Sequence, residues 1–198
     1  MVAAEQARDN IAQARAEWRE GMTALDPEKL VFIDESGFDT KMTRRFGRAT
    51  RGAPCVGAVP HGHWRNNTFI AGLRSDRIEA PMLIEGAMDG DAFTARVEQM
   101  LAPTLRAGDI MICDNHSVHK NAKARAAIEA RGAELRFLAA YSPDLNPIER
   151  VFAKLKAPVR GAAARCADTL YSAIASVLAA FTPQECARYL RHAGCAST

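Results

Sequence analysis

The sequence predicts an α/β domain built on a mixed five-stranded sheet flanked by helices, with a helical appendage at the N-terminus. Residues 30–33 (Leu-Val-Phe-Ile) and 110–113 (Ile-Met-Ile-Cys) are short, uninterrupted apolar runs, the pattern of strands buried on both faces of a sheet. The expected elements follow in the order three strands, helix, strand, helix, strand and then helices. A chain of 198 residues, 48% of them hydrophobic, has the size and apolar content of one folded domain.

The N-terminal residues predict a polar helix from residue 3 to about residue 20, with apolar side chains at helical spacing. Gly21 and Asp26-Pro27 end this helix. We therefore expect residues 1–28 to form an N-terminal helix and linker, and residues 29–198 to form the domain. The first strand is expected over residues 30–33.

Residues 40 to about 66 form a long basic stretch rich in glycine and proline, which predicts irregular structure. Loops of this length in compact domains tend to be functional. The next two strands are expected over residues 68–73 and 80–84, with a turn at residues 75–77. The second half then alternates, with a helix from Asp89 to about Leu101, a strand over 109–113, a helix from about Lys120 to Arg131 and a strand over 135–138.

The C-terminal part is expected to be helical. Asn146 is a good N-cap residue and Pro147 suits the first helical position, and an apolar stripe follows at Ile148, Val151, Phe152 and Leu155. Pro158 and Gly161 are expected to end or kink that helix. A second helix is expected over residues 169–181, and a third after Thr182-Pro183.

Three carboxylates stand out against this frame. Asp34 and Asp114 each follow a buried apolar run, and Glu149 lies in Tyr-Ser-Pro-Asp-Leu-Asn-Pro-Ile-Glu, with 34 residues between it and Asp114. Ligands bind at the carboxyl ends of such strands, and clustered carboxylates make a hard-oxygen site for divalent cations. Each aspartate alone equally suits the start of a loop, and the spacing of Asn146 and Glu149 equally suits a capping box. Glu35 is expected on the opposite face, as a surface residue or a neighbour of the ligands.

The segments Ile33–Ser36, Asp114–Lys120 and Tyr141–Glu149 together resemble the DDE transposases of the mariner superfamily, most closely the bacterial insertion-sequence branch. The resemblance covers roughly residues 28 to 195, and the order of elements resembles a ribonuclease H-like domain. It implies that Asp34, Asp114 and Glu149 are the catalytic residues and the ligands of two Mg²⁺ ions, for which Mn²⁺ can substitute. The implied activity is cleavage of DNA at transposon ends and transfer of the strand into target DNA.

Basic residues lie beside these carboxylates, although the net charge is only +3. Residues 40–75 hold seven basic side chains and no acid, and residues 150–167 hold five and no acid. Positive surface beside the site suits a polyanionic substrate, whereas the alternative is a solvated loop and a solvated helix face. The residues expected to contact DNA are Lys41, Arg44, Arg45, Arg48, Arg51, Asn115, His119, Arg150, Lys154 and Lys156.

The resemblance also implies the partners. They are duplex DNA, both terminal repeats and target, and a second copy of the chain in a homodimer. Residues 40–66 resemble the clamp that reaches another subunit in mariner-type transposases. Fewer than 30 residues precede the first strand, so we expect a helix-turn-helix module to come from an upstream product, as in a transposase split between two frames.

Several classes of protein are disfavoured by what the sequence lacks. No apolar stretch approaches the roughly 20 residues of a membrane span, and residues 1–8 lack the apolar core of a signal peptide. A cytoplasmic protein is therefore expected, and the resemblance implies that it lies at the bacterial nucleoid when bound to DNA. Five scattered cysteines without Cys-x-x-Cys spacing indicate reduced thiols and no zinc site. The chain also lacks Gly-x-Ser-x-Gly and Gly-x-x-x-x-Gly-Lys.

Two alternatives keep the fold and change the function. The chain could be an inactive or domesticated DNA-binding remnant that retains the three carboxylates, or a ribonuclease H-like nuclease that does not transfer strands. Metal-dependent nicking separates the first alternative from a transposase, and joining of cleaved ends to a target separates the second.

Overall fold

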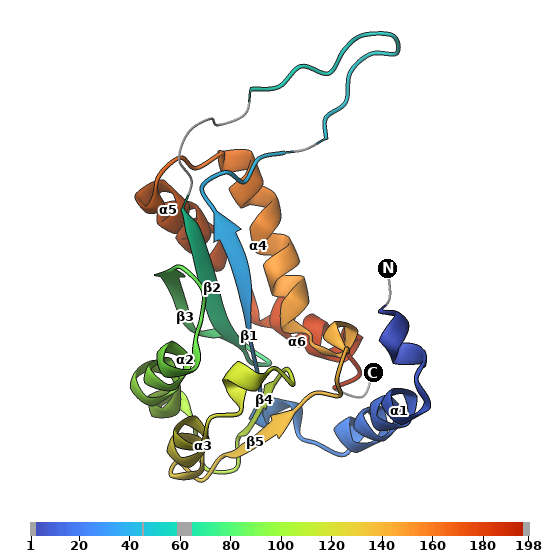
Figure 1. The fold of residues 1–198 in the computed structure, drawn as a ribbon, viewed down its shortest axis with the longest axis vertical. Coiled ribbons are helices and arrows are strands. Elements are labelled where there is room, and N and C mark those ends of the chain that lie inside the picture. Colours follow the sequence, from blue (N-terminus) through green and yellow to red (C-terminus); the bar gives the residue numbers. More distant parts are fainter. Residues whose placement is uncertain (1–2, 45, 59–64, 196–198) are drawn as a thin grey trace.

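The computed structural model describes residues 3–44, 46–58 and 65–195 (Figure 1). Five strands form one sheet in the order β3-β2-β1-β4-β5. Strand β1 is antiparallel to β2, which is antiparallel to β3, while β4 is parallel to both β1 and β5. The expected mixed five-stranded sheet is therefore confirmed. Its strands are β1 (Leu30–Asp39), β2 (Asn66–Leu73), β3 (Ile78–Glu85), β4 (Ile110–Cys113) and β5 (Glu134–Phe137).

Strand β1 is longer than the sequence indicates, so the expectation that Asp34 ends it is wrong. The parallel pairing with β4 stops at Ile33, opposite Cys113. The antiparallel pairing with β2 continues for six more residues, as far as Asp39 opposite Asn66. Because the apolar run stops at Ile33 and polar residues follow, the continuation is hidden in the sequence. Asp34 therefore lies inside a paired strand, one residue beyond the end of its parallel neighbour.

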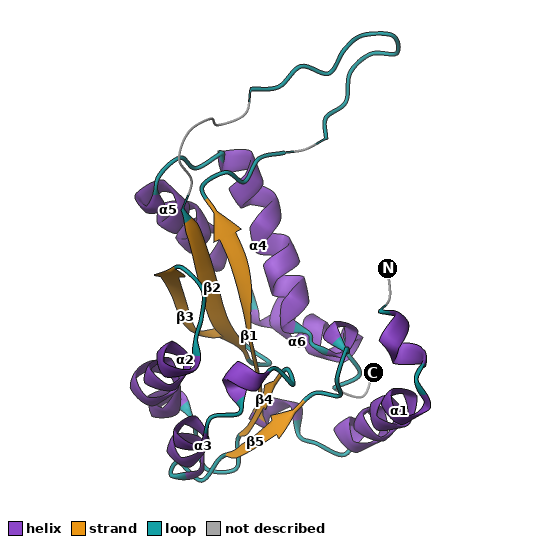
Figure 2. Ribbon diagram, in the orientation of Figure 1, coloured by secondary structure: helices purple, strands orange, loops and turns teal. Residues whose placement is uncertain are grey.

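Helices cover both faces of the sheet (Figure 2). Alternate residues of β1 point to opposite faces, so Leu30, Phe32 and Phe38 pack in one apolar cluster with the C-terminal helices. Val31 and Ile33 pack in a second cluster with the helices on the other face. The helices are α1 (Asp9–Thr23), α2 (Gly90–Arg96), α3 (Ala122–Glu129), α4 (Ile148–Ala162), α5 (Ala167–Leu178) and α6 (Pro183–His192), with a π-helical turn (Val97–Leu101) extending α2.

Two helices differ from expectation. Helix α1 continues through Gly21 to Thr23. Helix α4 continues through Pro158 and stops only at Ala163, which adopts a left-handed conformation with φ of 45°. The tertiary packing of Leu155 and Val159, both fully buried, holds the helix across the proline. By contrast, the N-cap of α6 is as expected, because the Thr182 side chain accepts a hydrogen bond from the Glu185 N–H.

The basic stretch between β1 and β2 projects from the body as a long arm (Figure 1). Residues 46–58 of this arm contain no helix or strand. Phe46 is 92% exposed and Val56 is 88% exposed, so the arm packs little of its apolar surface on the domain.

The remaining expectations about chain chemistry concern thiols and membranes. All five cysteines are free, and Cys113 is fully buried in the core. Across residues 3–44, 46–58 and 65–195, no helix is both long enough and apolar enough to cross a membrane.

Candidate active site

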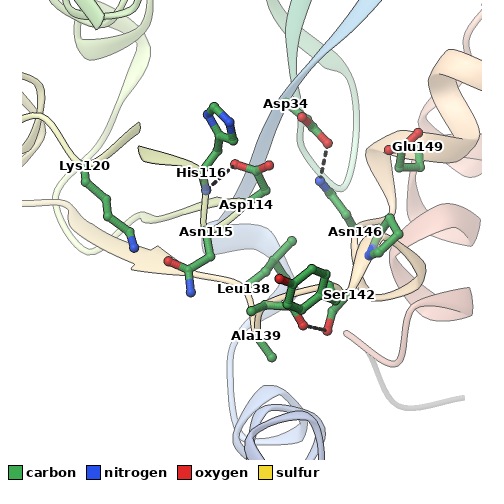
Figure 3. A pocket seen from close by; sticks show the side chains of 13 residues that line it. Asp34, Asp114, Asn115, His116, Lys120, Leu138, Ala139, Ser142, Asn146 and Glu149 are labelled. Atoms are coloured by element: carbon green, nitrogen blue, oxygen red, sulfur yellow. Dashed lines mark hydrogen bonds between the residues drawn. The ribbon is translucent and has the colours of Figure 1, made fainter. Parts of the chain in front are cut away.

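A cavity of about 480 Å³ opens beside the carboxyl end of β4 and the middle of β1 (Figure 3). Asp34, Asp114 and Glu149 all line it, so the fold brings together the three carboxylates singled out from the sequence. The rest of the wall consists of Asn115, His116, Lys120, Leu138, Ala139, Ala140, Tyr141, Ser142, Pro143 and Asn146.

Asp34 is the most deeply buried of the three, with 9% of its surface exposed. One carboxylate oxygen accepts a hydrogen bond from the Glu35 backbone N–H at 2.8 Å, and the other accepts one from the Asn146 side-chain amide at 2.8 Å. Burial raises the pKa of Asp34 to about 7, and the charges of Glu35, Asp114 and Glu149 also push it upward. A nearby cation would stabilise the charged form of this carboxylate.

Asp114 directly follows β4 and is held at one oxygen. Its Oδ1 atom accepts hydrogen bonds from the His116 backbone N–H at 3.1 Å and from His119 Nδ1 at 2.5 Å. Burial alone would raise the pKa of Asp114, but these hydrogen bonds outweigh it and hold the pKa below its ordinary value. Among the described residues, no group donates a hydrogen bond to its Oδ2 atom, which leaves that oxygen for a ligand.

His119 is fully buried, so the expectation that it contacts DNA is wrong. The short 3-10 turn Ser117–His119 places its ring against Phe93 of α2, with centroids 4.6 Å apart. There Nδ1 faces Asp114 and Nε2 lies 3.0 Å from Glu35. Burial lowers the pKa of His119, yet the two carboxylates outweigh it and raise that pKa to about 10. The imidazole thus orients Asp114 from behind, as partners of metal-ligating carboxylates do.

Glu149 differs from the two aspartates. It is the second residue of α4, and its side chain is exposed at the edge of the cavity. Its backbone N–H donates to the Asn146 carbonyl at 3.3 Å, but within the described part of the chain no group makes a hydrogen bond or ion pair with its carboxylate. Burial by the surrounding walls raises the pKa of Glu149, and the positive charge of Lys156 partly offsets that rise. Lys156, expected to contact DNA, is half-buried with its ammonium 5.8 Å from the Phe38 ring centroid, where it serves as a counter-charge to Glu149.

Asn146 does not cap α4, contrary to expectation. Helix α4 begins at Ile148 without a side-chain capping bond, and the Asn146 amide is turned toward Asp34 (Figure 3). Its Oδ1 atom is buried and has no hydrogen-bond partner. Sequence reasoning missed this contact because asparagine before a helix is an N-cap in most settings.

The donor set suits a divalent cation such as Mg²⁺. The candidate ligands are carboxylate oxygens, with an unpartnered amide oxygen on Asn146 nearby, and hard cations prefer oxygen. The carboxylates also raise the pKa of Asp34 by repulsion, which a cation would relieve. In residues 3–44, 46–58 and 65–195, however, no three acidic, histidine or cysteine side chains converge tightly enough to hold an ion unaided. The carboxylates share a cavity without closing a coordination shell.

The remaining residues expected to contact DNA fall into four groups. Lys154 is tied into the fold, because its ammonium bonds both Glu185 oxygens, the closer at 2.6 Å, and lies 4.2 Å from the Phe181 ring centroid. Asn115 lines the cavity (Figure 3), and Arg45 lies outside the described residues. The side chains on the surface are Lys41, Arg44, Arg48, Arg51 and Arg150.

Comparison with known proteins adds to this geometry. The family model described as "DDE superfamily endonuclease" matches residues 29–171. No curated protein matches the sequence. Among solved structures, the Mos1 transposase paired-end complex with the left transposon end has a TM-score of 0.79 at 16% identity, over 98% of this chain and 62% of that one. The catalytic domain of Mos1 mariner transposase has a TM-score of 0.71 at 14% identity, over 98% and 91%.

These likenesses confirm the expected ribonuclease H-like fold. The Mos1 Strand Transfer Complex is also similar in fold, with a TM-score of 0.76 at 16% identity, over 98% of this chain and 60% of that one. The chain thus spans about 62% of the transposase chain in the paired-end complex.

Proposed function

The chain belongs to the DDE superfamily endonucleases, and we propose that it is the catalytic domain of a mariner-type transposase of the bacterial insertion-sequence branch. It would cleave DNA at the ends of a mobile element and join the freed 3′ end to target DNA. The observation that carries this proposal is the meeting of Asp34, Asp114 and Glu149 in one open cavity beside the carboxyl end of β4. A polyanion is the natural occupant of a metal site beside exposed basic residues.

Asp34, Asp114 and Glu149 would hold two Mg²⁺ or Mn²⁺ ions. Bound ions would supply Lewis acidity, which activates water or a 3′-hydroxyl and stabilises the leaving oxygen. The described residues prepare this role, since His119 orients Asp114 and Asn146 orients Asp34. Solved Mos1 paired-end complexes with Mn and with Mg support the choice of ions.

DNA would lie across the cavity and the arm. The exposed side chains of Lys41, Arg44, Arg48, Arg51 and Arg150, with Arg45 among them in the sequence, would contact phosphates. Asn115 would contact DNA at the cavity wall. Because the arm leaves the body, we infer that it reaches a second copy of the chain in a homodimer. Phosphate contacts carry little sequence information, so we assign recognition of the terminal repeats to a helix-turn-helix module acting with this domain at the nucleoid.

The test is cleavage and joining of DNA that carries the element's ends. Purified protein should nick and join such DNA with Mg²⁺ or Mn²⁺, and chelator should stop both reactions. Asp114→Asn should bind DNA with unchanged affinity and cleave none. Cleavage in excess chelator, or full cleavage by Asp114→Asn, would overturn the metal-dependent assignment. Cleavage without joining would favour a nuclease, and binding without cleavage would favour an inactive remnant.

A further inference from the structure

One loop shapes most of the cavity. Residues 138–147 connect β5 to α4 and supply seven of the thirteen residues that line the wall. The loop also presents the Asn146 amide to Asp34 and leads directly into the first turn of α4, which carries Glu149. The shape of this loop therefore sets the position of two groups of the candidate site.

The loop adopts a conformation that requires outside support. Tyr141 has a φ of 56°, which lies in the left-handed region of the backbone map. Residues other than glycine and asparagine rarely adopt this conformation. The tyrosine is 51% exposed, so packing of its ring does not fix the backbone. Local hydrogen bonds are few, including those from the Leu145 N–H to Ser142 O and from Ser142 Oγ to Ala140 O, each 3.0 Å. Such backbone strain persists where the surrounding structure over-determines it.

Helix α1 supplies the support. Arg15 is 93% buried. Its guanidinium makes a bidentate contact with Asp144 of the loop, from Nη1 to Oδ1 at 2.9 Å and from Nη2 to Oδ2 at 2.6 Å. Its Nη1 atom also donates to Ser142 Oγ at 2.7 Å. Just before α1, the Gln6 side-chain amide donates to the Tyr141 carbonyl at 2.6 Å. A planar guanidinium fork fixes direction as well as distance, so these contacts hold the loop in one orientation.

We propose that Arg15 is a positioning residue of the candidate site, acting through the loop of residues 138–147. In this arrangement the N-terminal helix is part of the site and not merely an appendage. Any displacement of α1 would shift Asn146 away from Asp34 and move the start of α4. The catalytic consequence rests on the proposed function. The contacts of Arg15 with Ser142 and Asp144, which we call the latch, can be measured without DNA.

Hydrogen–deuterium exchange tests the latch. Arg15→Ala and Asp144→Ala should each speed exchange at the Leu145 and Asn146 amides by roughly tenfold. Because both changes break the Arg15–Asp144 ion pair, the effects of the two single variants should not add fully in the double variant. Arg19→Ala is the matched control, since Arg19 lies one turn later on α1, is 54% exposed and stands 3.7 Å from Asp144. It should leave the loop unchanged.

Cation binding tests the positioning role. Arg15→Ala should raise by roughly tenfold the Mg²⁺ concentration that gives half-maximal thermal stabilisation, with Arg19→Ala unchanged and Arg15→Lys intermediate. Where cleavage is measured, kcat should fall by a similar factor at constant KM for DNA. Equal loop exchange in Arg15→Ala and Arg19→Ala would overturn the latch, and so would faster exchange spread evenly through β1 and β4. A loosened loop with unchanged Mg²⁺ response would overturn the positioning role.

Two safeguards keep the test decisive. If Arg15→Ala does not fold, Ser142→Ala removes the hydrogen bond from Arg15, together with the one that Ser142 Oγ donates to the Ala140 carbonyl, and should speed exchange at the same amides. If the wild type never cleaves DNA, the exchange and Mg²⁺ measurements still decide the latch, and the failure belongs to the proposed function alone.

Discussion

The two halves of the candidate site are held in different ways. The strand half consists of Asp34 and Asp114, and each of them accepts two hydrogen bonds from the surrounding protein. The helix half is Glu149, which stands exposed at the start of α4. Among the described residues, no group donates a hydrogen bond to its carboxylate. The strand half is thus fixed before any ligand arrives, whereas the helix half is left free to adjust.

The difference follows from where each carboxylate is attached. Strand pairing on both sides fixes the backbone as far as Ile33 and Cys113, so the aspartates that follow inherit a rigid frame. Glu149 follows a loop that is held from outside by α1. Mg²⁺ demands near-octahedral oxygen geometry, which a carboxylate that is free to move can help to complete. We expect the free half to close on the ion.

Removing a charge from either half should have the largest effect. Asp34→Asn and Glu149→Gln should each lower metal-dependent cleavage on the order of a thousandfold, about 4 kcal/mol of transition-state stabilisation, because each deletes a proposed ligand. Single-turnover cleavage of end-containing DNA measures the loss. Near-normal rates in Glu149→Gln alone would break the comparison, since the helix half would then lie outside the site.

The pH dependence of stability should separate the halves next. Burial raises the pKa of Asp34 to about 7, so the folded state binds more protons than the unfolded state between pH about 4 and about 7. The free energy of unfolding of the metal-free protein should therefore fall as pH rises through that window, by up to a few kcal/mol. The pKa of Asp114 is lowered, so its effect lies below this window. The pKa of His119 is raised from 6.5 to about 10, so its effect begins only at the upper end of the window. Urea unfolding at several pH values measures the slope.

The control for this prediction is Asp34→Asn, in which the slope should largely vanish. Glu149 is exposed, and water screens it, so Glu149→Gln should keep most of the slope. A wild-type protein whose stability is flat from pH 4 to 7 would show that Asp34 is better solvated than the structure indicates.

The support behind Asp114 should matter less than the ligand itself. His119→Asn removes the bridge to Glu35 and should weaken Mg²⁺ binding by roughly 10- to 100-fold. On the helix side, Lys156→Met removes a counter-charge from a carboxylate that is already exposed, and should change Mg²⁺ affinity less. Calorimetric titration compares the two. A larger loss in Lys156→Met would reverse the comparison, making the helix half the more dependent on its surroundings.

The sequence predicted the strands of the parallel core, and the three carboxylates that it singled out line one cavity in the fold. Continuous apolar runs such as residues 110–113 have few alternatives to a buried strand, and the Tyr141–Glu149 motif is specific. The extension of β1 was missed because its pairing with β2 depends on a distant segment. Such pairings are set by tertiary structure, which local patterns do not contain.

Side-chain roles were predicted less well than positions. His119 was expected at a phosphate, yet its ring lies under Phe93 between two carboxylates. Asn146 was expected to cap α4, yet its amide holds Asp34. Both residues have several possible partners within reach in sequence, and only the folded arrangement selects one of them. The expectation that Glu35 neighbours the ligands agrees with its contact to His119.

The basic side chains of the arm, such as Arg44 and Arg48, are exposed like Glu149. Replacing Arg44, Arg45 and Arg48 together by alanine should weaken DNA binding by roughly tenfold at moderate salt and flatten its salt dependence, because three phosphate contacts are lost. Unfolding should change by no more than about 0.5 kcal/mol, since exposed charges contribute little. Lys123→Ala with Arg131→Ala, exposed on and just beyond α3, is the control. If both variants have the same DNA affinity and the same salt dependence, the arm does not bind DNA and is a solvated loop.

The smallest effect is expected for the stability of the metal-free protein when Glu149, the helix half of the site, is changed. Because the Glu149 carboxylate accepts no hydrogen bond in the described structure, Glu149→Gln should change the unfolding free energy of the metal-free protein by less than about 0.5 kcal/mol. The sign should favour the variant at neutral pH, since the raised pKa means that the charged form costs stability. Added Mg²⁺ should reverse the order, stabilising the wild type and not the variant. Thermal unfolding with Mg²⁺ and with chelator decides this. A large loss of stability in Glu149→Gln without Mg²⁺ would mean that the helix carboxylate is held after all, and the contrast between the two halves would fail.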